Sequence, residues 1–384
     1  MPELGCAQEY TAVIHWLGGA RPFTSPGVSA LTSVVWNRTA NDTGEATILI
    51  SKSMAGASCC GDLGRIEPWV HELSLYRDGE LVWQGPIIRV TENRTRFRVE
   101  ALDVTAWLAR CVNTTVLRYL ATDPADPHHV GPVQEIAHRI ITENLAGGLY
   151  APTPDWPRML PYIVRDDDSI VTRFEKDGTD DNSVWQVPIL QIINDELVPR
   201  GLEYTTVGRA LLLGRPQTTS DPAQARLDLD SIEGDVEIVR DGTAGATLVW
   251  VTNQNDEDIS GAQYGVSGVV SGVYGRLDTL IRSTAEGLSA YDLWQLARAS
   301  YNGRNPMPTS LRIPVGSSLS PRAPVTIRQL VPGVRIDVAA VGMCMGLTQP
   351  YRLSDLEVEW GDSGENVGIS LVPIGDPLTG APPT

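Results

Sequence analysis

Hydrophobic and polar residues alternate in short runs over the first hundred positions, as in β-strands that bury one face. These runs are rich in Val, Ile, Thr and Trp, and clusters of Gly, Pro, Asn and Asp separate them. The expected strands are residues 9–17, 32–38, 45–51 and 95–102. A short helix at 104–110, capped by Asp103, follows them. The pattern predicts a first β-barrel or sandwich domain over residues 1–115.

The strongest local signal is a β-hairpin in the segment HELSLYRDGELVWQGPI, residues 71–87. Its two alternating runs flank Asp78-Gly79, a dipeptide that favours a type I′ turn because both central residues need positive φ. The register of such a turn fixes the cross-strand neighbours. The expected pairs are Arg77 with Glu80, as an ion pair, and Leu75 with Val82, as an apolar pair.

Helical periodicity appears in the middle of the chain. Residues 131–145 place Val, Ile and Ala on one face after Pro132, and residues 188–198 repeat this pattern before Pro199 and Gly201. With the strands expected at 202–213, they predict a mixed α/β domain at 116–210. A second middle domain, at 211–305, is expected to be β-rich with a helix at 290–302.

The last part of the chain again alternates with the period of a strand. The expected strands are residues 309–313, 325–329, 335–341, 353–360 and 367–372. They predict a closing β-barrel domain at 306–384. The whole chain is therefore expected to be a β-rich α+β protein, with two β-barrel or sandwich domains around a mixed middle region.

Composition narrows the classes of function. The chain has 384 residues and a formal net charge of −17, with 42% hydrophobic residues. This charge argues against a surface that grips nucleic acid, because phosphate binding needs clustered Lys and Arg. The sequence has neither a long apolar run for a membrane helix nor a signal peptide at its start. We expect synthesis in a cytoplasm, with no membrane insertion.

One motif invites comparison with an enzyme. Gly361-Asp362-Ser363-Gly364 has the order of a serine-protease nucleophile turn. That chemistry also needs a histidine base held by an aspartate, and none of the five histidines lies in such a context. We interpret the motif as a hairpin turn between two strands.

Metal sites are also disfavoured. His128, His129 and His138 have no Cys or carboxylate at zinc-ligand spacing. The acidic residues of the 166–168 and 177–181 segments lack the alternation and central glycine of a calcium loop. The adjacent Cys59 and Cys60 belong to no C-x-x-C pair, so we expect reduced thiols. No catalytic, cofactor-binding or metal-binding residue is assigned, and no cofactor is expected.

Two passages resemble one known family. The "strand, R-D-G, strand, V-W-x-G-P" order of residues 71–87 is similar to the first barrel of minor tail proteins of siphoviruses that infect actinobacteria. The segments LVPGVRIDV, residues 330–338, and YRLSDLEVEWGDSGENVGISLVP, residues 351–373, resemble the closing β-domain of those proteins. The motif residues, expected to be structural, are Arg77, Asp78, Gly79, Trp83, Gly85, Pro86, Pro332, Gly333, Gly364 and Glu365.

The resemblance implies a baseplate hub, or tail tip, similar to the central hub of contractile-tail phages. In that family a homotrimeric ring adapts the sixfold tail tube to a central tip and lines the DNA channel. The implied partners are further copies of the chain, the distal tail protein ring, the tape measure protein, downstream tail-tip or fibre proteins, and phage DNA that passes without specific binding. The implied location is the virion tail tip. We expect fibre and wall-degrading activities to belong to other proteins.

Two alternatives stay open. The same β modules would suit a distal tail ring or a fibre adaptor. A β-rich hydrolase or carbohydrate-binding protein could use the ten tryptophans to stack on sugars. We favour packing roles for the tryptophans that fall in or near expected elements: Trp36, Trp83, Trp107, Trp185, Trp250, Trp294 and Trp360.

Overall fold

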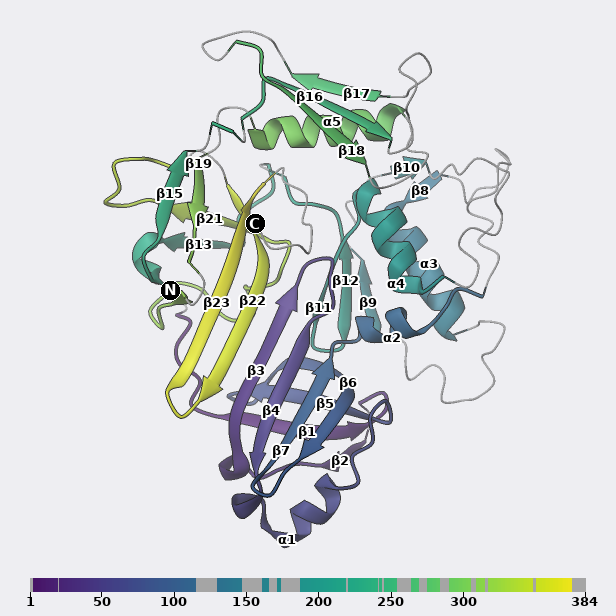
Figure 1. Cartoon of the computed structure of the whole chain (residues 1–384), viewed down its shortest axis with the longest axis vertical. Helices are drawn as coiled ribbons and strands as arrows, with labels where there is room; N and C mark the ends of the chain where they lie inside the picture. Colours follow the sequence, from purple (N-terminus) through teal and green to yellow (C-terminus); the bar gives the residue numbers. More distant parts are fainter. Residues whose placement is uncertain are drawn as a thin grey trace.

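The computed structural model gives a β-rich molecule with few helices (Figure 1). It describes residues 3–19, 21–114, 130–146, 161–165, 171–173, 187–218, 220–240, 242–243, 245–253, 264–268, 275–283, 290–304, 309–314, 317–347 and 350–374. The prediction of a β-rich chain with a few helices is confirmed. The division into two barrels, with boundaries at 115, 210 and 305, stays a prediction.

The largest sheet has eleven strands and takes them from both ends of the chain. Ten lie in one path, in this order: β13 (Ala225–Asp228), β21 (Arg335–Ala339), β22 (Tyr351–Gly361), β3 (Leu31–Thr39), β4 (Glu45–Ser51), β7 (Arg96–Leu102), β6 (Glu80–Glu92), β5 (His71–Arg77), β1 (Tyr10–Trp16) and β2 (Pro22–Thr24). The eleventh, β23 (Gly364–Pro373), pairs with β22. Strands β13 and β21 are parallel, and the other pairs are antiparallel.

The smaller sheets come mostly from the middle of the chain. Two have three strands: β11 (Glu203–Val207), β12 (Ala210–Gly214) and β9 (Tyr162–Arg165); and β17 (Tyr264–Gly268), β16 (Leu248–Asn253) and β18 (Asp278–Ser283). Three have two strands: β8 (Val130–Pro132) with β10 (Val171–Arg173), β14 (Ile232–Glu233) with β20 (Ser318–Leu319), and β15 (Glu237–Arg240) with β19 (Thr309–Arg312).

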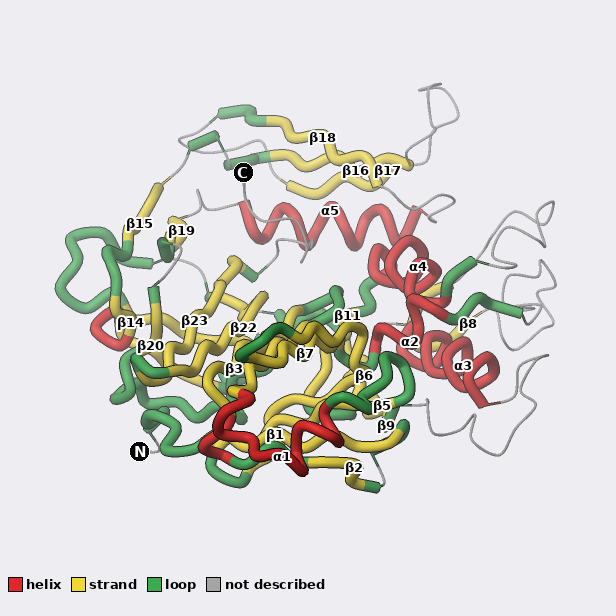
Figure 2. Tube along the Cα trace, turned by 60° about the horizontal axis from the view of Figure 1, so that its bottom comes forward, coloured by secondary structure: helices red, strands yellow, loops and turns green. Residues whose placement is uncertain are grey.

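The helices pack at the periphery of the sheets (Figure 2). They are α1 (Lys52–Leu63), α2 (Thr105–Arg110), α3 (Val133–Ala146), α4 (Ile189–Ile192) and α5 (Ala290–Arg304). A π turn, Ile193–Leu197, and a 3-10 turn, Val198–Arg200, continue α4. Helix α5 packs on the sheet of β16 and β17. No helix in the described ranges is long and apolar enough to span a membrane.

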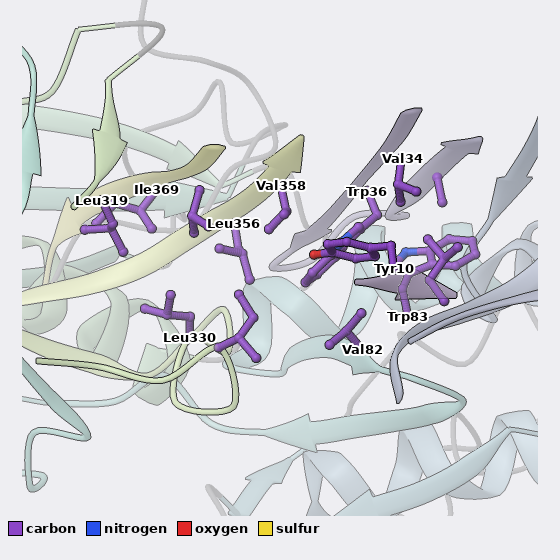
Figure 3. Close-up of a cluster of buried hydrophobic side chains, with 14 of the residues drawn as sticks. Tyr10, Val34, Trp36, Val82, Trp83, Leu319, Leu330, Leu356, Val358 and Ile369 are labelled. Carbon is purple, nitrogen blue, oxygen red and sulfur yellow. The ribbon is translucent and has the colours of Figure 1, made fainter. Parts of the chain in front are cut away.

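The seam between β22 and β3 joins the C-terminal hairpin to the N-terminal strands. Its register runs from Asp355 opposite Thr39 to Trp360 opposite Val34. One apolar core follows from this pairing, because the inward side chains of both ends fill the same interior. Figure 3 shows Tyr10 and Trp36 from the N-terminal strands close to Val358, with Leu356 and Leu330 farther along the same core.

Separate apolar clusters stabilise the middle of the chain. One packs α3, α4 and the β11–β12 hairpin around Ile140, Ile192 and Leu211. Another packs α5 on β16 through Leu293, Ala297 and Val249. The helices predicted at 131–145, 188–198 and 290–302 are thereby confirmed, with ends shifted by a few residues.

The predicted hairpin is confirmed at its turn and corrected behind it. Asp78 and Gly79 have φ of 50° and 82°, and Arg77 faces Glu80 as expected. A bulge between Leu75 and Tyr76 then shifts the register, so Leu75 lies opposite Trp83 and not Val82. The predicted Arg77–Glu80 ion pair is also wrong, since each residue has a distant ionic partner described below.

One predicted strand is wrong, and one helix was not predicted. Residues 325–329, predicted as a strand, form a turn in which the Gln329 side-chain oxygen accepts the Thr326 N–H at 2.9 Å. Val325 and Ile327 are both buried there, so the alternation of apolar and polar residues reflects the burial of this turn and not a strand. Helix α1 was not predicted, because its small and polar residues carry little helical periodicity.

Candidate functional site at the junction of the terminal segments

A buried ion pair connects the β5–β6 hairpin to the C-terminal β22–β23 hairpin. Arg77, at the end of β5, donates from Nη2 to Glu365 Oε2 at 2.7 Å and from Nε to Oε1 at 2.9 Å. The Glu365 side chain is 1% exposed and that of Arg77 is 11% exposed. Two parallel charge-assisted hydrogen bonds hold both groups in one geometry. Two motif residues from opposite ends of the sequence therefore meet.

The carboxylate of Glu365 also holds the N-terminal segment. The Tyr10 hydroxyl donates to Oε1 at 2.8 Å, and the backbone N–H of Ala7 donates to Oε2 at 2.8 Å. Arg77 Nη2 in turn donates to the carbonyls of Leu4 and Gly5. We call Arg77, Glu365 and Tyr10 the end-joining cluster.

Two tight turns place the charged members of this cluster. The Asp78 carboxylate accepts hydrogen bonds from the backbone N–H groups of Gln8 and Glu9 at 2.9 and 3.0 Å. These bonds hold the Asp78-Gly79 turn against the residues that directly precede β1. In the second turn, Gly361 and Gly364 face each other across the β22–β23 hairpin, and Gly364 has φ of 98°. Glu365 follows directly, so the turn aims its side chain at Arg77.

Burial and the charge of Glu365 together set the pKa values in the cluster. Burial raises the pKa of Tyr10 far above the ordinary value, and the nearby Glu365 charge adds to this rise. The hydrogen bonds with Glu365 raise the pKa of Arg77. Trp36 Nε1 donates to the Tyr10 hydroxyl at 3.3 Å, which links the cluster to the apolar core. The hydroxyl thus stays neutral and donates, as the geometry requires.

Arg38 is a second buried cation at the junction. It is 2% exposed, and its guanidinium donates to the backbone carbonyls of Val82, at 2.6 Å, and of Leu330 and Ile327, at 3.4 and 3.5 Å. The guanidinium also lies 5.1 Å from the centre of the Trp36 ring. Burial lowers the pKa of Arg38 to about 10. This side chain connects β3, β6 and the 325–330 turn.

Acidic groups connect the middle segment to both ends. Glu203 forms a buried ion pair with Arg352 of β22, and burial raises the pKa of Glu203. Glu72 of β5 pairs with Arg209 at 3.3 Å. Asp103 accepts hydrogen bonds from the Gly44 N–H at 2.7 Å and from the Thr206 hydroxyl at 2.8 Å. The β11–β12 hairpin is therefore tied to the large sheet on several sides.

The remaining motif residues occupy crowded positions. A Cβ on Gly85 would lie 1.9 Å from the backbone oxygen of Leu102, so any larger residue at this position of β6 would clash with that backbone. Trp83 is 2% exposed, and Pro86 lies opposite Glu72 in the β5–β6 pair. Pro332 is buried, and Gly333, with φ of 93°, donates its N–H to the Leu353 carbonyl at 2.7 Å.

The enzyme-like motif is a turn, as predicted. Asp362 and Ser363 are the two loop residues between β22 and β23. Over the described part of the chain, no group of three or more His, Cys, Asp or Glu side chains is placed to hold a metal ion. The candidate ligands at 128–129, 166–168 and 177–181 lie outside the described residues. Cys6, Cys111 and Cys344 are free thiols, and the side chains of Cys59 and Cys60 are outside the description.

The tryptophans divide between core and surface. Trp36, Trp83 and Trp107 are buried, which confirms the packing interpretation for them. Trp294 is 39% exposed and contacts Arg298 through its ring. Trp250 and Trp360 are half-buried, and Trp185 lies outside the described residues.

Sequence reasoning missed Tyr10, Arg38 and the Glu203–Arg352 pair, and it found Asp103 as a helix cap without its contacts to Gly44 and Thr206. The sequence did contain a signal for Arg38. Val34, Trp36 and Arg38 are alternate residues of β3 and therefore point to the same, buried face of the sheet. The partners of the other groups lie up to 355 positions away in sequence, as in the Tyr10–Glu365 hydrogen bond. Local patterns carry no information on such pairs.

Comparison with family models gave no match, and comparison with curated protein sequences gave none either. Solved structures do match over almost the whole chain. The 43 kDa tail protein of prophage MuSo2 from Shewanella oneidensis aligns with a TM-score of 0.56 at 13% identity, covering 95% of this chain and 98% of that one.

Two further tail proteins align equally broadly. A tail protein from Neisseria meningitidis MC58 has a TM-score of 0.54 at 12% identity, covering 94% of this chain and 96% of that one. Prophage tail protein gp18 from Listeria monocytogenes has a TM-score of 0.54 at 8% identity, with 94% of both chains covered. At sequence identities this low, the similarity concerns the fold alone. The chain has the fold of these phage tail proteins.

Proposed function

We propose that this chain is a structural subunit of a phage tail, a hub of the tail tip or baseplate, and not an enzyme. The observation that carries the proposal is the fold match, which extends over at least 94% of the chain for three phage tail proteins. A match of this extent spans the terminal segments and the middle of the chain together. In this proposal the motif residues have structural roles, which is supported by the Arg77–Glu365 contact and by the lack of space for a Cβ at Gly85.

In the proposed assembly three copies form a ring that adapts the sixfold tail tube to the central tip. Domains 1–115 and 306–384 supply the ring, and domains 116–210 and 211–305 face neighbouring proteins. The distal tail protein ring, the tape measure protein and downstream tip or fibre proteins are the proposed partners. DNA passes through the channel without specific binding, which the charge of −17 favours. The siphovirus type and the actinobacterial host rest on the motif resemblance alone.

The experiment combines mass in solution with location in the particle. Light scattering on the purified chain should give three times the 41.6 kDa chain mass, and negative-stain images should show a threefold ring. An antibody against the chain should label the tail end of the parent particle. A hexamer would favour a distal tail ring instead. Unlabelled particles together with hydrolysis of a glycan or peptidoglycan would favour the enzyme alternative.

A further inference from the structure

The outward face of the large sheet has a split distribution of charge. Its inward side chains, such as Trp36 and Val358, are buried in the core, so their strand neighbours point to solvent. Towards β22 these outward neighbours are acidic, and towards β6 and β7 they are mostly arginine. Between the two groups lie the uncharged side chains of Val35, Thr47 and Leu49.

The acidic half consists of Glu45, Asp355, Glu357 and Glu359. Glu357 and Glu359 are successive outward residues of β22, and Glu357 lies opposite Asn37. Asn37 Oδ1 accepts the backbone N–H of Glu45 at 2.6 Å, so Glu45 lies next in the same row. Among the described residues, none of these four carboxylates has a salt bridge. Desolvation raises the pKa of Glu357, and Glu359, Glu45 and Asp355 raise it further.

This arrangement costs stability within one chain. Like charges at neighbouring positions of a sheet are destabilising, and no cation of the described chain offsets them. A protein whose function depends only on folding gains nothing from this row. The repulsion disappears when a positively charged surface covers the acidic half, and the binding surface of such a partner must therefore be cationic.

The same sheet carries a surface of the required sign. The arginine half consists of Arg89, Arg94, Arg96 and Arg98 on the β6–β7 hairpin, and all four are exposed. Arg89 and Arg98 share one carboxylate, Glu100, at 3.2 and 2.8 Å. Two cations on a single anion leave positive charge unbalanced. The chain thus presents both halves of a complementary pair.

The spacing allows each half to meet a different neighbour. Strands β22 and β6 are four steps apart in the sheet order, which is about 19 Å at the usual strand separation. Sheets twist by roughly 20–25° per step, so the two halves face directions that differ by roughly 80–100°. A ring needs two unlike surfaces on each subunit that point in different directions.

We propose that the acidic half of one copy docks on the arginine half of the next copy, and that this contact closes the ring. The inference rests on the proposed function, because it names the faces by which the hub subunits associate. A second copy is the occupant that the charges favour, since one gene product supplies both surfaces. Nucleic acid fits less well, because the acidic half would repel it.

Charge reversal tests the contact. We would compare three variants of the full chain by light scattering at 0.1 M salt: Glu357→Arg with Glu359→Arg, Arg94→Glu with Arg96→Glu, and all four changes together. Each double variant should weaken association at least tenfold, and the fourfold variant should regain it because the complementary signs are restored. Circular dichroism and melting temperature report whether each variant folds. The matched control reverses the exposed Glu237–Arg312 pair on β15 and β19, and should leave association unchanged.

The outcomes separate this inference from the proposed function. A wild-type oligomer that neither double variant weakens would overturn the docking faces and leave the hub proposal standing. A wild-type monomer that still labels the tail end would also overturn self-docking, while the tail function would hold. Association by these faces should further weaken at 1 M salt, where the screening length falls from about 10 Å to about 3 Å.

Discussion

Replacing Glu365 with glutamine should destabilise the chain markedly. The substitution keeps the size of the side chain and removes the charge that balances Arg77. Breaking a buried ion pair costs about 3–5 kcal/mol. We expect about 3 kcal/mol here, because Arg77 keeps its bonds to the Leu4 and Gly5 carbonyls and is 11% exposed.

Urea unfolding followed by tryptophan fluorescence measures this loss. With a slope of about 3 kcal/mol per M, a loss of about 3 kcal/mol lowers the midpoint by about 1 M. Trp36, which donates to Tyr10 of the cluster, contributes to this emission together with the other nine tryptophans. The matched control is Arg328→Gln, which breaks the exposed ion pair with Glu80 and should leave the urea midpoint nearly unchanged.

A double-mutant cycle isolates the pair itself. Arg77→Met leaves the carboxylate unpaired, and the double variant removes both charges. The double variant should therefore be more stable than the sum of the two single losses predicts, by about 2 kcal/mol or more. A Glu365→Gln loss no larger than that of Arg328→Gln, with no coupling in the cycle, would refute the role assigned to the end-joining cluster.

Three further changes test other parts of the fold. Gly85→Ala should reduce the melting temperature strongly or prevent soluble expression, because the added Cβ would lie 1.9 Å from the backbone oxygen of Leu102. Gly27→Ala, which has open space around the added Cβ, should be neutral, and equal melting temperatures for the two variants would contradict the close approach at Gly85. Arg38→Met should cost at least about 2 kcal/mol in urea unfolding, since it leaves buried carbonyls without donors; a loss below about 0.5 kcal/mol would count against the three-way contact. Burial lowers the pKa of His15 and His71 below 6.5, so the unfolded chain binds more protons in the window beneath that value, and stability should fall as pH drops from 6.5 towards 5. His15→Phe should flatten this dependence in melting curves recorded across the window, and an unchanged slope would exclude His15 as its source.

Local sequence patterns predicted the local parts of this structure. The Asp78-Gly79 turn followed from its φ requirement, and the helix at α3 followed from its apolar period. The partner of Arg77 did not follow, because the hairpin register places Glu80 opposite Arg77, whereas Glu365 is 288 positions away. The bulge behind Leu75 likewise depends on packing of the whole sheet and leaves no mark in the alternation.

The candidate site was predicted as two separate motifs and not as one cluster. Arg77 and Glu365 were both singled out, each within its own terminal segment. Their contact needs the seam between β22 and β3, and strand pairing across the whole chain has no signature in residue periodicity. The tertiary role of Asp103 was missed because its position as a helix cap already explained it locally. The hydrogen bond that it accepts from the Thr206 hydroxyl joins residues that are distant in the sequence.

The seam between β3 and β22 also has a consequence for synthesis on the ribosome. Strand β3 emerges early, yet its partner β22 is made some 320 residues later, as the register of Asn37 with Glu357 shows. During that interval one edge of β3 has free backbone donors and acceptors, a state that invites aggregation. Chains released before β22 is made keep this open edge, so the large sheet is complete only after the β22–β23 hairpin has been synthesised.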